Sequence, residues 1–99
     1  MPRRKNTVIA LTIYTRPGCH LCQEMKVTVE RVVRDTHAQA RIEEIDIAND
    51  ADLEARYALE IPVLLVNGKK AAKYRVSSEE LGRILTGRAG QAGERGEAG

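Results

Sequence analysis

The chain has 99 residues, of which 42% are hydrophobic and 30% charged, so it fits one globular domain. Its formal net charge of +2 is too small to indicate nucleic-acid binding. No stretch approaches the ~20 apolar residues of a membrane span, and the N-terminal residues lack the features of a signal peptide. We therefore expect a cytoplasmic protein that contacts neither nucleic acid nor membrane.

The first part of the chain predicts a strand followed by a helix. Residues 8–14 ("VIALTIY") are nearly all apolar and rich in β-branched side chains, which predicts a strand buried on both faces of a sheet. Residues 19–34 then have apolar side chains at helical spacing, which predicts a helix packed against that sheet. These side chains are Leu21, Met25, Val29, Val32 and Val33.

The middle of the chain repeats this alternation. Residues 41–47 ("RIEEIDI") predict a second strand, and residues 49–60 predict a second, shorter helix. Asn49 or Asp50 would cap that helix, because a side-chain oxygen at this position accepts hydrogen bonds from free backbone N–H groups. A strand, a helix and a strand in this order favour a parallel pair with a right-handed crossover.

The last part of the chain predicts a hairpin and a third helix. Val63–Val66 predicts a short apolar strand, and Asn67-Gly68 after it is a strong turn signal because both residues tolerate positive φ. Residues 69–75 would return as an antiparallel strand. Residues 77–85 ("SSEELGRIL") begin with a serine cap and an acidic first turn, which predicts a final helix.

The predicted element order is therefore β-α-β-α-β-β-α. It indicates an α/β domain with one four-stranded mixed sheet flanked by three helices, and we expect this domain to span residues 1–86. Residues 87–99 have glycine at every third position but no proline and only a few triplets. They cannot form a collagen helix, and we expect them to be a disordered glycine-rich tail.

The only two cysteines, Cys19 and Cys22, stand three positions apart in "TRPGCHLCQEM". Such a pair could hold a metal, form a structural disulfide or perform redox chemistry, and a reducing cytosol disfavours the structural disulfide. Because Cys19 lies at the predicted helix start, free N–H groups and the helix dipole should lower its thiol pKa below ~8.5. Cys22 lies almost one turn later and should be less exposed. The spacing favours attack by Cys19 and resolution of the mixed disulfide by Cys22.

Three further residues are candidates for the same site. Arg16 and His20 flank Cys19, and a positive charge on either would lower the thiol pKa further, although each could equally be an exposed side chain without a role. Pro62 directly precedes the third strand, where proline is tolerated because it cannot donate to a sheet ladder. From the residues alone, the Ile61–Pro62 bond could be trans or cis.

The motifs "YTRPGCHLCQEMK", "EEIDI" and "IPVLLVNGKKAAKYR", followed by a final helix, resemble the glutaredoxin-like branch of the thioredoxin superfamily over roughly residues 8–86. The resemblance implies a thioredoxin fold in which Cys19 is the attacking and Cys22 the resolving cysteine. It also implies a cis Ile61–Pro62 bond facing the cysteines, with the backbone of Ile61 pairing with a substrate peptide or glutathione.

The same resemblance implies a thiol–disulfide oxidoreductase without a tightly bound cofactor. Its substrate would be a protein or low-molecular-weight disulfide, and glutathione or a thioredoxin-reductase-type enzyme would restore the dithiol. Arg16 and His20 would then border the substrate, and Ser77 or Ser78 at the start of the last helix could bind a carboxylate such as that of glutathione. We expect the protein to act as a monomer.

Two alternatives stay open at the level of the sequence. Relatives of this fold share an iron–sulfur cluster between two subunits, with glutathione supplying the missing thiolates. Structural zinc suits the chain less well, because it needs four ligands and no second cysteine pair exists. The chain could also be a non-catalytic binding module that keeps the fold. Absorbance of the purified protein would identify a cluster, and a turnover assay would separate the catalyst from the module.

Overall fold

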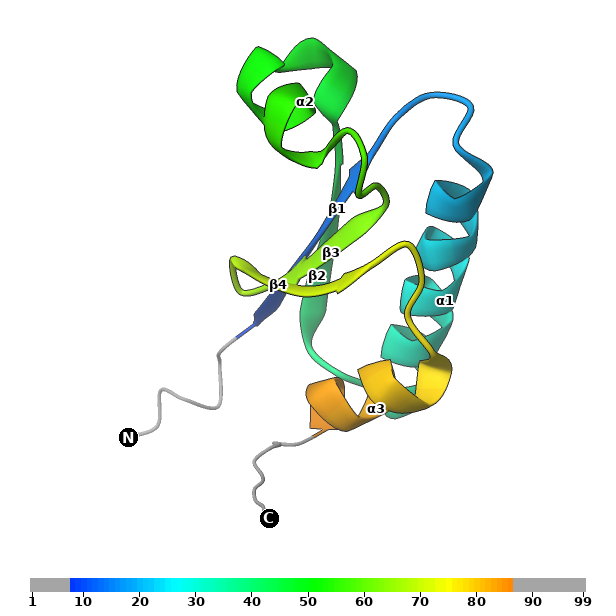
Figure 1. The fold of residues 1–99 in the computed structure, drawn as a ribbon. Helices are drawn as coiled ribbons and strands as arrows, with labels where there is room; N and C mark the ends of the chain where they lie inside the picture. The colour runs from blue at the N-terminus through cyan, green and yellow to red at the C-terminus, as the bar shows by residue number, and fades with distance from the viewer. Residues whose placement is uncertain (1–7, 87–99) are drawn as a thin grey trace.

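A computed structural model describes residues 8–86 of the chain. The predicted disordered tail, residues 87–99, lies outside the described residues. The elements follow the predicted order, with one additional 3₁₀ helix after the second strand (Figure 1). They are β1 (Ile9–Thr15), α1 (His20–Thr36), β2 (Ala40–Asp46), η2 (Ile47–Asn49), α2 (Ala51–Tyr57), β3 (Val63–Val66), β4 (Lys69–Lys73) and α3 (Ser78–Thr86).

The four strands form one mixed sheet in the order β2-β1-β3-β4. β1 and β2 pair in parallel, with Ile9 opposite Ala40 and Thr15 opposite Asp46. β1 also pairs antiparallel with β3, and β3 pairs antiparallel with β4. The predicted parallel pair, crossover helix and final hairpin are therefore confirmed.

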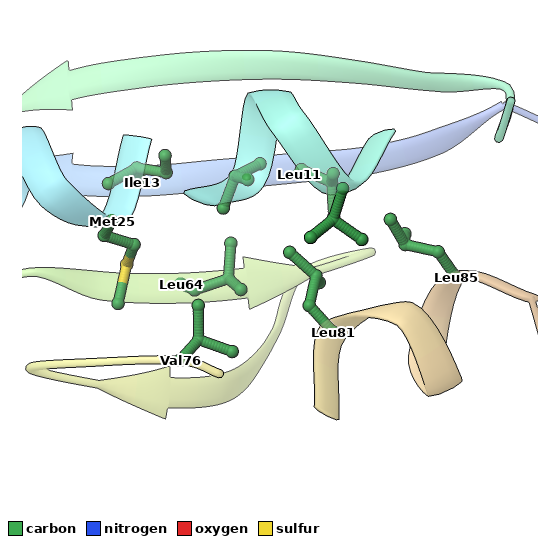
Figure 2. Packing of buried hydrophobic residues seen from close by; sticks show 9 residues of the cluster. Leu11, Ile13, Met25, Leu64, Val76, Leu81 and Leu85 are labelled. Carbon is green, nitrogen blue, oxygen red and sulfur yellow. The ribbon is translucent and has the colours of Figure 1, made fainter. Parts of the chain in front are cut away.

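The main core lies between the sheet and the two helices α1 and α3, which cover the same face (Figures 1 and 2). Leu11 and Ile13 of β1 point into this core with Leu64 of β3, and none of the three is more than 1% exposed. Met25 and Leu81 meet them from the two helices. Burial of these apolar side chains is the main contribution that holds the helices on the sheet.

The opposite face of the sheet is only partly covered. β1 was predicted to be buried on both faces, but the side chains that alternate with Leu11 and Ile13 are half-buried. The reason is that α2 has only 7 residues and lies at one end of the sheet, where the ring of Tyr57 packs 4.8 Å from that of Tyr14. The prediction is therefore wrong for one of the two faces.

Local capping sets two element boundaries in the middle of the chain. The second strand was predicted to reach Ile47 but ends at Asp46, because the Asp46 side chain accepts a hydrogen bond from the N–H of Ala48 at 2.9 Å and starts η2. Ile47 is still fully buried. Of the two predicted caps for α2, Asp50 is the one observed, accepting from the N–H groups of Asp52 and Leu53.

The hairpin and the last helix form where the sequence predicts them. Asn67 and Gly68 have φ angles of 52° and 86°, as the predicted turn requires. The return strand is shorter than predicted and ends at Lys73, because Tyr74 adopts a left-handed φ of 68° that turns the chain away from the sheet. Ser77 caps α3 by accepting a hydrogen bond from the N–H of Glu80 at 3.0 Å.

Candidate active site

Cys19 and Cys22 lie where the chain passes from β1 into α1. Pro17 and Gly18 make the turn, with Gly18 at a left-handed φ of 78° that favours glycine. The N–H of Cys19 donates to the carbonyl of Arg16 at 3.2 Å and closes this turn. Cys19 is the N-cap residue of α1, and its sulfur accepts a hydrogen bond from the N–H of Cys22 at 3.1 Å. The predicted position of Cys19 at the helix start is therefore confirmed.

The two cysteines form a disulfide, with their Cα atoms 5.2 Å apart. Cys22 is only 2% exposed and packs inside the protein, whereas Cys19 is half-buried. An incoming thiol or disulfide can therefore reach the sulfur of Cys19 much more easily than that of Cys22. This difference agrees with the prediction that Cys22 is the less exposed thiol.

A cavity of about 470 Å³ opens beside the disulfide on the side of β2. Both cysteines line it together with the turn at Pro17 and Gly18. Its far wall contains Lys26 of α1 and Glu44 of β2, which form an ion pair at 3.3 Å. The sequence offered one signal for Lys26, because it follows Cys22 by four residues and so lies on the same side of the helix.

Arg16 lines the same cavity but is already paired. Its guanidinium donates to the carboxylate of Glu54 in α2. Two atoms of this pair, Nε of Arg16 and Oε1 of Glu54, are buried without a hydrogen-bond partner in the structure. The contact joins the cysteine loop to α2 across 38 positions of sequence, so no local pattern could reveal Glu54 as part of the site.

His20 is the first residue of α1 and its side chain is 84% exposed. Its Nε2 atom lies 3.5 Å from a carboxylate oxygen of Glu24, one turn further along the same helix. Its side chain thus stands in solvent next to Cys19 in the sequence and contacts the carboxylate of Glu24.

The Ile61–Pro62 peptide bond is cis, as the resemblance implied. Pro62 is buried and Ile61 half-buried. Because Val63 is paired with Tyr14 in the sheet, Pro62 lies beside the end of β1, from which the cysteine loop departs. The carbonyl of Pro62 accepts a hydrogen bond from the N–H of Tyr74 at 2.7 Å. The sheet thereby brings this segment next to the cysteine loop.

The two serines proposed to bind a carboxylate lie in different surroundings. Ser77 lines a groove of about 290 Å³ together with Leu21, which stands between the two cysteines, and with Tyr74. Its hydroxyl already caps α3. The hydroxyl of Ser78 instead accepts a hydrogen bond from Arg31 of α1 at 2.8 Å. Only Ser77 therefore shares a hollow with the cysteine motif.

Two observations concern metals and membranes. Residues 8–86 contain no group of three or more His, Cys, Asp or Glu side chains placed to hold a metal ion. No helix formed by these residues is long and apolar enough to cross a membrane.

The fold is shared with known proteins. A family model described as "Glutaredoxin-like domain (DUF836)" matches residues 10–86. The "Glutaredoxin-like protein YDR286C homolog" of Dictyostelium discoideum is 32% identical over 77 residues, which cover 74% of this chain and 71% of that protein. The solution structure of protein Ne2328 from Nitrosomonas europaea superimposes with a TM-score of 0.69 at 28% identity, covering 81% of this chain and 94% of the other. Chloroplastic thioredoxin z, at 12% identity, shares the fold with a TM-score of 0.64 over 83% of this chain and 79% of its own.

Proposed function

The chain belongs to the glutaredoxin-like domain family and has a thioredoxin fold, and on this basis we propose that it is a thiol–disulfide oxidoreductase using Cys19 and Cys22. The observation that supports the proposal best is the unequal burial of the two sulfurs at one helix start. A half-buried Cys19 is joined to a Cys22 that is 2% exposed. A pair in which one cysteine is much more exposed than the other suits a reaction in which the exposed cysteine attacks and the buried one resolves.

The reaction begins with the reduced pair. The Cys19 thiolate attacks one sulfur of a substrate disulfide, so that a Cys19–substrate disulfide forms and one substrate thiolate leaves. The Cys22 thiolate then attacks the Cys19 sulfur, which releases the second substrate thiolate and forms the Cys19–Cys22 disulfide. Two electrons pass from the protein dithiol to the substrate, and the two substrate thiolates take up the two protons that the dithiol gives up.

The geometry of the helix start favours the Cys19 thiolate. In the disulfide form the Cys19 sulfur already accepts a hydrogen bond from the N–H of Cys22. Such a bond becomes stronger when the acceptor is charged, and the positive end of the helix dipole acts in the same direction. Arg16 would add less than an unpaired cation, since it is paired with Glu54.

The partners are part of the proposal. We propose a protein or low-molecular-weight disulfide as substrate, bordered by Cys19, His20 and the backbone of Ile61. Either glutathione or a thioredoxin-reductase-type enzyme would return the disulfide to the dithiol. If glutathione does so, its thiolate would attack the Cys19 sulfur and its carboxylates would reach the groove at Ser77.

Turnover with two substrates tests this function. The wild-type protein should reduce insulin disulfides with dithiothreitol, or a glutathione mixed disulfide with glutathione and glutathione reductase. Cys19→Ser should abolish both activities, because it removes the attacking thiol. Cys22→Ser should abolish the reduction of insulin, which needs both thiols, but can retain turnover of the glutathione mixed disulfide. Wild-type protein that turns over neither substrate, with both cysteines intact, would favour the non-catalytic binding module.

A further inference from the structure

A basic and aromatic surface surrounds the cis Ile61–Pro62 segment. We call it the basic tyrosine surface, and it consists of Arg56, Tyr57, Leu59, Lys70, Lys73 and Tyr74. Lys70 and Lys73 stand opposite Leu65 and Val63 in the β3–β4 ladder. Val63 in turn stands opposite Tyr14, whose ring packs on Tyr57. The two lysines therefore extend over the sheet face that α1 and α3 leave uncovered.

The cations of this surface lie against its tyrosine rings. The guanidinium of Arg56 lies 5.6 Å and the ammonium of Lys70 5.9 Å from the ring centre of Tyr57. The ammonium of Lys73 lies 5.6 Å from the ring centre of Tyr74. Attraction between a cation and an aromatic face orients both groups, so the charges are held in defined positions on the surface.

The positive charges outnumber the negative ones. Lys70 donates a hydrogen bond to the carboxylate of Glu60 at 2.7 Å, and this bond raises the pKa of Lys70 and lowers that of Glu60. Within residues 8–86, neither Arg56 nor Lys73 forms an ion pair. The surface thus contains three cations, of which only Lys70 is in an ion pair within the described part of the chain, while Lys73 contributes more weakly to lowering the pKa of the same carboxylate, Glu60.

The surface is continuous with the redox site through Tyr74. Tyr74 lines the groove that also contains Leu21 of the cysteine motif. Its N–H donates to the carbonyl of Pro62 at 2.7 Å, and its hydroxyl donates to the carbonyl of Leu59 at 2.7 Å. Tyr74 therefore joins the groove at Leu21 to the cis-proline segment and to Leu59.

Leu59 adds an apolar contact in the middle of this charged surface. Its side chain is 88% exposed, and the hydrogen bond from Tyr74 fixes its backbone. In a complex, this exposed leucine can contact an apolar residue that lies next to acidic residues in a polypeptide. A phosphate backbone would use the cations but leave Leu59 without a partner.

We propose that the basic tyrosine surface recognises an acidic segment of the polypeptide whose disulfide reacts at Cys19. The inference rests on the proposed oxidoreductase activity and adds the class of its substrate. The chemical steps at Cys19 and Cys22 stay as proposed above, because the surface would change only how fast the two proteins associate. Complementary charges at the border of an interface raise the association rate and make it depend on salt.

The experiment measures how fast the reduced protein is oxidised by matched disulfides. Two cyclic peptides contain the same disulfide ring and differ only in flanking glutamates or lysines, and hydroxyethyl disulfide serves as a small neutral substrate. At low ionic strength the acidic peptide should react about tenfold faster than the basic one. The preference should shrink near 0.15 M salt, where screening acts over about 8 Å.

Charge reversal assigns the effect to this surface. The double variant Arg56→Glu/Lys73→Glu should lower the ratio of acidic-peptide rate to neutral-disulfide rate about tenfold. The matched control is Arg41→Glu/Arg83→Glu, which makes the same change in net charge at two exposed cations of β2 and α3. This control should keep at least half of the wild-type ratio.

Each result decides the proposal. Equal rates for the two peptides, or an equal loss of preference in both double variants, overturn it. The surface would instead bind nucleic acid if single-stranded RNA slows oxidation by hydroxyethyl disulfide and the peptides show no charge preference. If hydroxyethyl disulfide fails to oxidise the wild-type protein, the proposed oxidoreductase function itself is refuted. A missing charge preference alone refutes only the proposal about the substrate.

Discussion

Arg16 shows how a single contact changes the charge that stands beside Cys19. The sequence places this cation next to Cys19, where a free positive charge would favour the thiolate. The structure instead pairs it with Glu54. Two opposite charges therefore stand near the cysteine loop, and Glu54 holds the Arg16 side chain.

Substitutions of the two partners should move the pKa of the reduced Cys19 thiol in opposite directions. Glu54→Gln leaves Arg16 uncompensated and should lower that pKa, while Arg16→Gln leaves Glu54 uncompensated and should raise it. The rate of alkylation against pH, measured with Cys22→Ser as background, gives both values. Glu30→Gln on the exposed side of α1 is the matched control. Shifts of the same sign would mean that the pair only orders the loop.

At the level of elements, the start of α3 contains two adjacent serines with different contacts. Ser77 satisfies a free N–H group of the helix, whereas Ser78 accepts a hydrogen bond from Arg31 at the protein surface. The helix start next to the cysteine groove is therefore already capped by its own chain. A bound carboxylate would have to share these N–H groups with the Ser77 hydroxyl.

Removal of each hydroxyl should separate the two contacts. Ser77→Ala removes a helix cap and should lower the free energy of unfolding by about 1 kcal/mol. Ser78→Ala removes only an exposed hydrogen bond and should cost roughly half of that or less. Urea denaturation followed by circular dichroism measures both values. A larger loss for Ser78→Ala would show that the contact between α1 and α3 matters more than the cap.

Considered as a whole, the molecule has one well-packed side and one partly open side. α1 and α3 bury the core residues on one face (Figures 1 and 2). The short α2 covers little of the other face, and Leu59 and the cations Arg56, Lys70 and Lys73 are exposed. Under the proposal above, stability and substrate recognition depend on different faces. The disulfide lies beyond the end of β1, where the chain passes into α1.

Two leucines of opposite burial test this division. Leu81 is 0% exposed, and Leu81→Ala should lower the free energy of unfolding by about 2–5 kcal/mol because it opens a cavity. Leu59 is 88% exposed, and Leu59→Ala should stay within about 0.5 kcal/mol of the wild type. Thermal and urea unfolding of both variants provide the comparison. Similar losses would contradict the assignment of Leu59 to recognition.

Sequence patterns predicted the elements well because they depend on local and periodic features. The apolar stripe of α1, the Asn67-Gly68 turn and the serine cap of α3 each have a short-range physical cause, and each is observed. The strand ends were less accurate, because an aspartate side chain and a left-handed Tyr74 set them.

The site was predictable only where its residues are neighbours in sequence or match a known motif. The position of Cys19 followed from the helix start, and the cis bond at Pro62 followed from the resemblance to glutaredoxins. The sequence did not predict Glu54 as the partner of Arg16, because the two residues are 38 positions apart and only the packing of α2 brings them together. The open sheet face was also missed, since the length of α2 depends on its tertiary contacts.

The division of labour between the two cysteines can be read from a trapped intermediate. Cys22→Ser is reduced, mixed with a disulfide-bonded peptide and analysed by intact mass and peptide mapping. One peptide strand should be joined to Cys19, because no second thiol remains to displace it. Cys19→Ser under the same conditions should form little adduct, since the remaining sulfur belongs to a residue that is 2% exposed. An adduct at Cys22 that forms as fast as that at Cys19 would contradict the assignment of Cys19 as the attacking residue.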